Sequence, residues 1–321
     1  MGYIYAIKEG IKLVHRVWQL VLVQLGMVLI SGISFFVFVG IPLAFAFIIF
    51  NVDLTGIAQK DILYILKEPS EIISKYFGVA LFVIIGLVVY IFAVITFSIY
   101  VFGGSVGVIG KVIEDKNLKF SLHLFFSEAK RLFLPMLGFT TLVGIILIVV
   151  AFVFGILGGT IVALVSYIKR LDSTLALFIS LFFSMILILL LLVMFFGIIS
   201  ITIYGTAALS IKGMGPLGSL KDGFHYIMKH PHAFWLYLIL FGIYILISFI
   251  LILFGYPFKL IPVIGSFISF PYQLISYVFQ TYVGLIIIAV IFIYYYFTEI
   301  HKEPVVENSA SRDPLKDGKN G

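Results

Sequence analysis

Six long stretches of the chain contain no Asp, Glu, Lys or Arg. They cover residues 17–52, 76–110, 132–168, 173–211, 230–258 and 260–298. A helix crosses the hydrocarbon core with about 20 apolar residues, and two crossings joined by a turn need about 44. Each stretch therefore predicts one spanning helix, and we place the six spans at residues 17–40, 77–102, 132–155, 175–203, 233–255 and 272–297.

Each stretch is longer than one crossing requires. Non-helical backbone in lipid leaves N–H and C=O groups unpaired unless protein or water covers them. Glycine and proline mark three places where the spare residues could form bent, interfacial or partly re-entrant segments: the stretch after Pro42, residues 155–159, and the region of Pro257, Pro262 and Pro271.

The composition agrees with this pattern. The chain is 62% hydrophobic and 11% charged, whereas soluble domains are about 45–50% apolar and about 25% charged. The residues outside the six stretches are too few and too scattered for a separate soluble catalytic domain. We predict an all-α polytopic membrane protein, with one membrane-embedded domain at residues 1–298 and a disordered cytoplasmic tail at residues 299–321.

The basic residues predict the orientation, since cytoplasmic flanks of spans are enriched in Lys and Arg. If the N-terminus is inside, the inner segments hold 15 of the 21 Lys and Arg residues. Both termini are therefore expected in the cytoplasm. Because these flanks account for the net charge of +6, no nucleic-acid partner is expected.

Three short segments, before the first, third and fifth spans, have apolar residues at helical spacing opposite basic ones. Such a pattern is typical of helices that lie in the membrane interface. In the first segment the apolar face is Ile4, Ile7, Ile11 and Val14. The basic faces of the three segments contain Lys8, Lys12 and Arg16, then Lys130 and Arg131, then Lys221 and Lys229.

The three segments share a local signature, an acidic residue followed by a small one: Glu9-Gly10, Glu128-Ala129 and Asp222-Gly223. This recurrence predicts three copies of one unit, each an interfacial helix followed by a two-span hairpin. The alternative is that any cytoplasmic approach to a membrane favours an amphipathic helix, without duplication.

The interior of the spans offers little chemistry. No span interior contains a carboxylate, Lys or Arg, and such residues are the usual marks of proton relays and ion paths. Proton-coupled transport is therefore disfavoured. Gln24 in the first span and Gln280 in the sixth are the candidates for a polar cavity, although most polar side chains in spans simply hydrogen-bond between helices.

All six histidines fall on the predicted cytoplasmic side, and His225, His230 and His232 lie close in sequence. Three imidazoles with a water molecule could bind zinc. Their spacing matches no zinc motif, and the alternative is that they are surface groups of an interfacial helix. The chain has no Cys, no nucleophile elbow and no phosphate loop. No cofactor and no enzymatic activity are expected.

Three stretches of the chain form a further pattern: Ser219-Leu220-Lys221-Asp222-Gly223-Phe224, Phe234-Trp235 and Ile261-Pro262-Val263-Ile264-Gly265. This pattern resembles prokaryotic six-span membrane proteins related to the membrane domain that is fused to glycerophosphodiester phosphodiesterases. The resemblance covers most of residues 1–298 and implies the inner membrane of a prokaryote. In the fused enzymes the hydrolase is a separate soluble barrel, so the resemblance implies a membrane fold and no catalytic residue.

These observations favour a non-catalytic membrane domain that contacts membrane lipids, partner proteins or a second copy of itself. A transporter-like protein for an apolar or amphiphilic substrate, with Gln24 and Gln280 near the path, is the alternative. A histidine-dependent membrane enzyme at the cytoplasmic face is the third hypothesis.

Overall fold

The structure, a computed structural model, describes residues 2–49, 69–259 and 264–301. These residues are almost entirely helical and contain no strand. Within them, six helical stretches are long and apolar enough to cross a membrane. The prediction of an all-α polytopic membrane protein is therefore confirmed.

The described helices lie in chain order as follows. The first crossing is built from α2, a short π-helix η1 and α3, and the others are single helices. Two shorter helices, α1 and α9, precede the first and fifth crossings. The bounds are α1 Tyr3–Arg16, α2 Gln19–Phe35, η1 Phe36–Gly40, α3 Ile41–Ile49, α6 Pro69–Glu114, α7 Leu122–Lys169, α8 Ser173–Ile211, α9 Pro216–Lys229, α10 Pro231–Lys259, α11 Ile264–Tyr295 and the π-helix η2 Tyr296–Ile300.

The helices extend beyond the predicted spans. The expected break at residues 155–159 is wrong, because α7 continues without interruption to Lys169. Its 48 residues make a helix of about 72 Å, against a hydrocarbon core of about 30 Å. Glycine permits a break but does not force one, and a continuous helix keeps every backbone group paired.

The other predicted irregular places are also helical where they are described. Pro42 lies in α3, after the π-helix η1, and Pro257 and Pro271 lie inside α10 and α11. Pro262 falls outside the described residues. So does most of the predicted tail, although Glu299 and Ile300 belong to η2.

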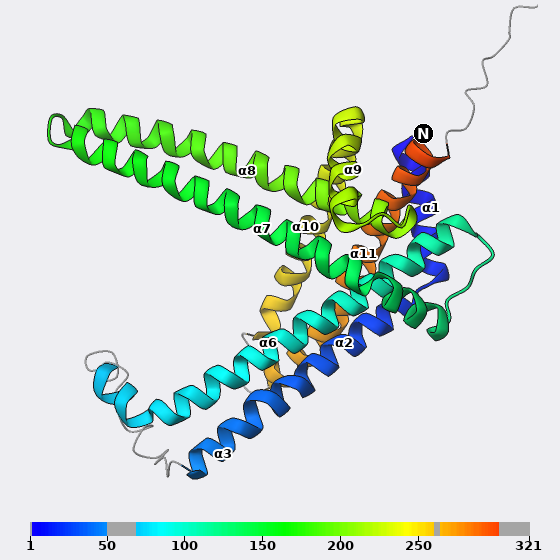
Figure 1. Cartoon of the computed structure of the whole chain (residues 1–321), viewed down its shortest axis with the longest axis horizontal. Helices are drawn as coiled ribbons and strands as arrows, with labels where there is room; N and C mark the ends of the chain where they lie inside the picture. The colour runs from blue at the N-terminus through cyan, green and yellow to red at the C-terminus, as the bar shows by residue number, and fades with distance from the viewer. Residues whose placement is uncertain (1, 50–68, 260–263, 302–321) are drawn as a thin grey trace, which may run out of the picture.

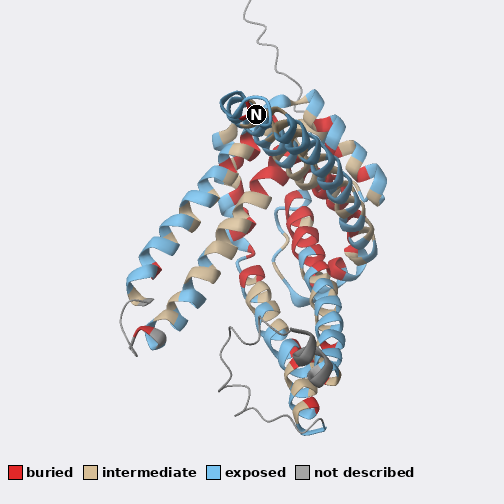
Figure 2. Ribbon diagram, turned by 90° about the vertical axis from the view of Figure 1, so that its left-hand side faces the viewer, coloured by how far each residue is buried: buried red, intermediate tan, exposed pale blue. Residues whose placement is uncertain are grey.

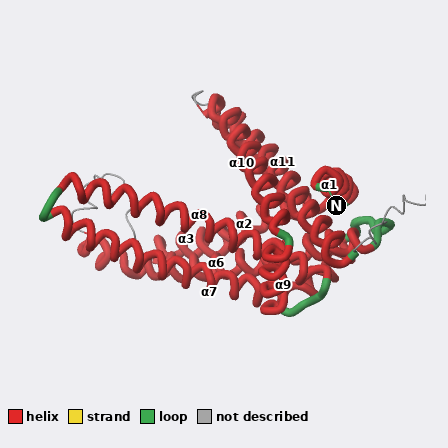
Figure 3. Tube along the Cα trace, turned by 90° about the horizontal axis from the view of Figure 1, so that it is seen from above, coloured by secondary structure: helices red, strands yellow, loops and turns green. Residues whose placement is uncertain are grey.

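The crossings associate as three antiparallel pairs: α2 and α3 with α6, α7 with α8, and α10 with α11. The pairs diverge from a common region near the N-terminus, as Figures 1 and 3 show from two directions. Away from this region most apolar side chains are exposed. Such exposure fits a protein whose solvent is lipid.

The buried side chains gather where the three pairs meet (Figure 2). We call this region the hub. It comprises α1, α9 and the adjoining ends of the longer helices, at residues 99–114, 122–139, 199–211, 231–240 and 285–300. One contiguous core joins these ends, so the hub is where the fold is held together.

Candidate functional site

The three amphipathic segments, residues 3–16, 122–133 and 216–229, all lie in the hub. Each packs on the last helix of a different pair: α1 on α11, the start of α7 on the end of α6, and α9 on the end of α8. The first segment of the chain thus contacts the last pair, and each later segment contacts the pair before it. The contacts form a closed cycle that links all three pairs.

The contact between α9 and α8 brings the backbones of the two helices together. Gly223 is buried, and a Cβ atom on it would lie 2.6 Å from the carbonyl oxygen of Ile201 and 2.7 Å from the backbone nitrogen of Gly205. Both neighbours are backbone atoms, which cannot rotate away. Glycine is therefore required here because the two helix backbones touch.

The other two contacts also use the small residue of the acid-small signature. A Cβ on Gly10 would lie 2.4 Å from Cγ2 of Val290 in α11. Ala129 packs on α6, where a Cβ on Gly104 would lie 3.0 Å from the Ala129 Cβ. Small residues at these points allow the segments to approach their partner helices closely.

The three segments bury residues in the same register. Relative to the small residue of the signature, the buried positions are four residues before it, the small residue itself and three residues after it. These sets are Ala6, Gly10 and Leu13; Phe125, Ala129 and Leu132; and Ser219, Gly223 and Tyr226. The threefold repeat stays a prediction, and the shared register is the observation that supports it.

The apolar face expected for the first segment is only partly the buried one. Val14 is buried as expected, but Ile4 is 72% exposed and Ile11 44% exposed. The helix instead turns Ala6 and Gly10 towards the hub. The reason is steric, because only a face of small residues allows close contact with α11. The larger apolar side chains are left on the exposed face, where they can contact lipid.

The acidic residue of the signature binds a basic residue near the hub in every segment. Glu9 accepts a hydrogen bond from Lys12 at 2.8 Å. Glu128 is 5% exposed and pairs with Arg131 at 2.5 Å, while Arg131 also donates to the carbonyl of Ser210 at 3.2 Å. The second pair thus joins α7 to the end of α8.

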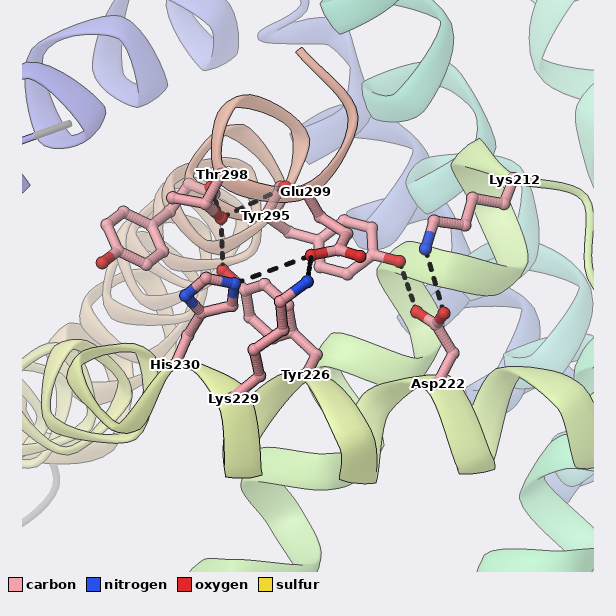
Figure 4. A network of polar contacts seen from close by, with 9 residues as sticks. Lys212, Asp222, Tyr226, Lys229, His230, Tyr295, Thr298 and Glu299 are labelled. Atoms are coloured by element: carbon pink, nitrogen blue, oxygen red, sulfur yellow. Dashed lines mark hydrogen bonds and ion pairs between the residues drawn. The ribbon is translucent and has the colours of Figure 1, made fainter. Parts of the chain in front are cut away.

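In the third segment the pairing crosses between helices (Figure 4). Asp222 of α9 pairs with Lys212, just after α8, at 2.9 Å, and accepts a hydrogen bond from the Tyr295 hydroxyl of α11 at 2.5 Å. The Lys212 ammonium also lies 5.1 Å from the centre of the Tyr295 ring. One carboxylate therefore connects α8, α9 and α11.

A second branch of this polar network lies one helical turn further along α9. The Tyr226 hydroxyl and Thr298 are 2.6 Å apart. Lys229 and His230 approach Glu299 at 3.5 and 3.6 Å. Burial raises the pKa of the Tyr226 phenol above its ordinary value, so this hydroxyl stays neutral even at an alkaline pH that would ionise an exposed tyrosine.

The structure does not bring the three candidate histidines together as a metal site. No group of three potential metal ligands occurs among the described residues. His230 lies against Tyr226 and Glu299, whereas His225 is exposed. His232 is also exposed and contributes its backbone carbonyl, which accepts a hydrogen bond from Tyr3 at 2.8 Å.

Several candidate basic residues are already engaged within the protein. Lys12, Arg131 and Lys229 form ion pairs, and Arg16 donates to the backbone carbonyl of Lys116. The remaining three, Lys8, Lys130 and Lys221, are exposed. In the described part of the chain, no carboxylate lies within ion-pairing distance of their ammonium groups. Each amphipathic segment thus presents one lysine without an ion-pair partner among the described residues, and we call these three the unpaired lysines.

The two glutamines that were candidates for a polar cavity have different surroundings. The Gln24 amide donates to the Ser105 hydroxyl at 3.0 Å and so bridges α2 to α6. Gln280 lines a groove of about 300 Å³ between α10 and α11. The nearest link is the Tyr277 hydroxyl, 3.5 Å from the backbone carbonyl of Gln24. The groove is lined by Leu251, Ile252, Gly255, Ser269, Tyr272, Gln273, Ser276, Tyr277 and Gln280.

Sequence reasoning missed most of this groove. Ser269, Gln273 and Ser276 line it together with Gln280, and all four recur at intervals of three or four residues. That spacing places them on one face of α11. The same spacing is present in the sequence of the sixth charge-free stretch and could have predicted the groove. The network around Asp222 had no such signal, since its members come from three separate helices.

No known protein family, curated protein or solved structure matches this chain. The resemblance to six-span membrane proteins thus stays a prediction. What the chain does must be argued from the hub and the groove.

Proposed function

We propose that this integral membrane protein is non-catalytic and that its hub binds anionic lipids at the cytoplasmic surface of a prokaryotic inner membrane. The observation that carries the proposal is the pair of features on each amphipathic segment. Each presents one unpaired lysine, and beside it exposed apolar side chains that include Ile4 and Ile11, Leu122 and Phe126, and Phe224 and Met228.

The charge distribution supports the orientation. The hub and the loops that adjoin it hold 11 of the 17 Lys and Arg residues that precede residue 299, and positive flanks are retained in the cytoplasm. The cytoplasmic leaflet carries the anionic lipids, and each Lys or Arg near its surface gains about 1 kcal/mol. Apolar side chains beside a lysine add insertion into the boundary between head groups and acyl chains. Three such sites around one hub would hold a ring of acidic lipids.

The three unpaired lysines provide the test. We expect the triple variant Lys8→Gln, Lys130→Gln, Lys221→Gln to lower the affinity for phosphatidylglycerol by about fivefold per site. The measurement is native mass spectrometry of the full chain, released from nanodiscs of mixed phosphatidylglycerol and phosphatidylcholine. The ratio of the two lipids that remain bound is compared between variants.

The control removes basic residues at the far end of α7, with Lys169→Gln and Arg170→Gln, both exposed. That variant is expected to retain phosphatidylglycerol as the unmodified protein does. Equal retention by the triple lysine variant, or no preference for phosphatidylglycerol in the unmodified chain, would contradict the proposal.

A second candidate is the movement of an amphiphilic substrate across the membrane. The groove at Gln280 favours it, because a polar surface within a span is costly and usually functional. The test is flux of a labelled amphiphile into liposomes that contain the protein. Flux should fall in Gln280→Leu, and flux that does not depend on this residue would remove the support for transport.

A further inference from the structure

The groove between α10 and α11 lies at the end of this helix pair that is distal to the hub. It is built from the C-terminal part of α10, at Leu251 and Gly255, and the N-terminal half of α11. We infer that it binds the uncharged, hydrogen-bonding head group of an amphiphile whose chain remains in the membrane. The inference rests on the protein spanning a membrane, but not on lipid binding by the hub.

The polar surface of the groove is a stripe along one face of α11. Ser269, Gln273, Ser276 and Gln280 follow one another at spacings of four, three and four residues. They extend over about 16 Å of helix, roughly half of the hydrocarbon thickness. Such a stripe on a helix that is otherwise apolar requires a polar neighbour, since hydrocarbon cannot hydrogen-bond.

The described residues do not supply that neighbour to most of the stripe. The Ser276 hydroxyl is shielded from solvent and has no hydrogen-bond partner among the described residues. The same part of the structure contains no hydrogen bond from the side-chain amides of Gln273 or Gln280. The two amides thus offer donors and acceptors to whatever occupies the groove, and Ser276 lies beside them in its lining.

Both walls of the groove are fixed. The Tyr272 hydroxyl donates a hydrogen bond to the Leu251 carbonyl across to α10. A Cβ on Gly255 would lie 2.4 Å from the Tyr272 ring, so glycine is what allows the ring to lie against α10. On the inner side, Tyr277 reaches α2 through the carbonyl of Gln24. The groove is therefore held open between α10 and α11 and is not a gap that side chains can simply fill.

The chemistry of the lining selects the class of ligand. None of the nine lining residues is charged, so a phosphate, carboxylate or ammonium would lose its hydration without a counter-charge. A pure hydrocarbon would leave the amides unpaired. A volume of about 300 Å³ is at the lower end of ligand sites and suits a head group the size of glycerol. A neutral amphiphile with hydroxyl groups meets all three conditions.

The experiment compares three photoreactive probes that share one diazirine-bearing acyl chain. Their heads are glycerol, a carboxylate and a methyl ester, and each is added to the full chain in nanodiscs of phosphatidylcholine. Cross-linked peptides are quantified by mass spectrometry. We expect the glycerol-headed probe to label residues 251–280 about fivefold more than either of the others, in line with two additional hydrogen bonds in the membrane.

Two variants localise the binding. Ser276→Ala combined with Gln280→Leu should reduce labelling by the glycerol-headed probe about fivefold, and Gly255→Ala should reduce it by displacing Tyr272. Ser184→Ala on an exposed face of α8 is the matched control and should leave labelling unchanged.

Equal labelling of the unmodified protein by all three probes would overturn the inference. It would mean that the groove does not distinguish the head groups and that water forms the hydrogen bonds to the polar stripe. Unchanged labelling in the double variant would overturn it as well. The hub lysines are intact in all of these variants, so a negative result for the groove does not contradict lipid binding by the hub. In the same way, a negative result for the lysine variant does not contradict ligand binding in the groove.

Discussion

Gly223→Val is expected to destabilise the folded protein by about 3 kcal/mol or more, at the upper end of the usual cost of overpacking. The added Cβ would overlap the carbonyl oxygen of Ile201 and the backbone of Gly205. Side chains can change rotamer to relieve such an overlap, but these atoms belong to helix backbones. Relief therefore requires α9 to move away from α8, which opens one link of the cycle that holds the hub.

The matched control lies on the same helix. A Cβ on Gly218 would meet only the Cβ of Met214, at 3.9 Å, so Gly218→Ala should not lower stability. The measurement is the thermal midpoint of each variant in detergent, followed by light scattering and by chromatography. A Gly223→Val protein that melts with the unmodified chain would show that α9 and α8 are not in backbone contact.

Asp222→Ala is expected to cost about 2 kcal/mol, less than the 3–5 kcal/mol for breaking a fully buried pair because the site is partly open to solvent. Lys212 and Asp222 are 22% and 21% exposed. Removing the carboxylate leaves a largely desolvated ammonium without a counter-charge. It also leaves the Tyr295 hydroxyl without its acceptor, so the ends of α8 and α11 lose their common contact with α9.

Glu9→Gln serves as the comparison for this variant. Glu9 pairs with Lys12 within one helix, and that lysine side chain is 68% exposed, so we expect a change of less than about 0.5 kcal/mol. Midpoints of thermal unfolding in the same detergent test both substitutions. If the two variants lose equal stability, Asp222 does not act as a link between helices.

Much of the fold was predictable because lipid places a simple demand on the sequence. A segment of about 20 residues that must remain in hydrocarbon cannot contain many charges, and each of the six charge-free stretches is helical over nearly all of its described length. The positions where helices end were less predictable. The region around Gly155, where a break was expected, is part of the continuous helix α7. Glycine allows the backbone more conformations but does not prevent a helical one.

The hub was predictable in part. The acid-small signature at Glu9, Glu128 and Asp222 marked the residues at the helix contacts, because close approach requires a small side chain wherever it occurs. The residues that these positions contact could not be predicted from the sequence. Tyr295 is 73 positions from Asp222 in the chain, and no local pattern specifies such a pairing. The polar stripe on α11 was overlooked for another reason, since single Ser and Gln residues in a span are common and only their spacing sets them apart.

The contact between α1 and α11 has a consequence for biosynthesis. The buried face of α1 around Gly10 has its partner at Val290, which is translated 280 residues later. Until the final crossing has been inserted, this face of α1 lacks its main packing surface. Assembly of this protein should therefore be completed only after translation has passed α11. A nascent chain that stops short of α11 would leave the face of α1 around Gly10 exposed, and membrane proteases that remove misassembled proteins could recognise it.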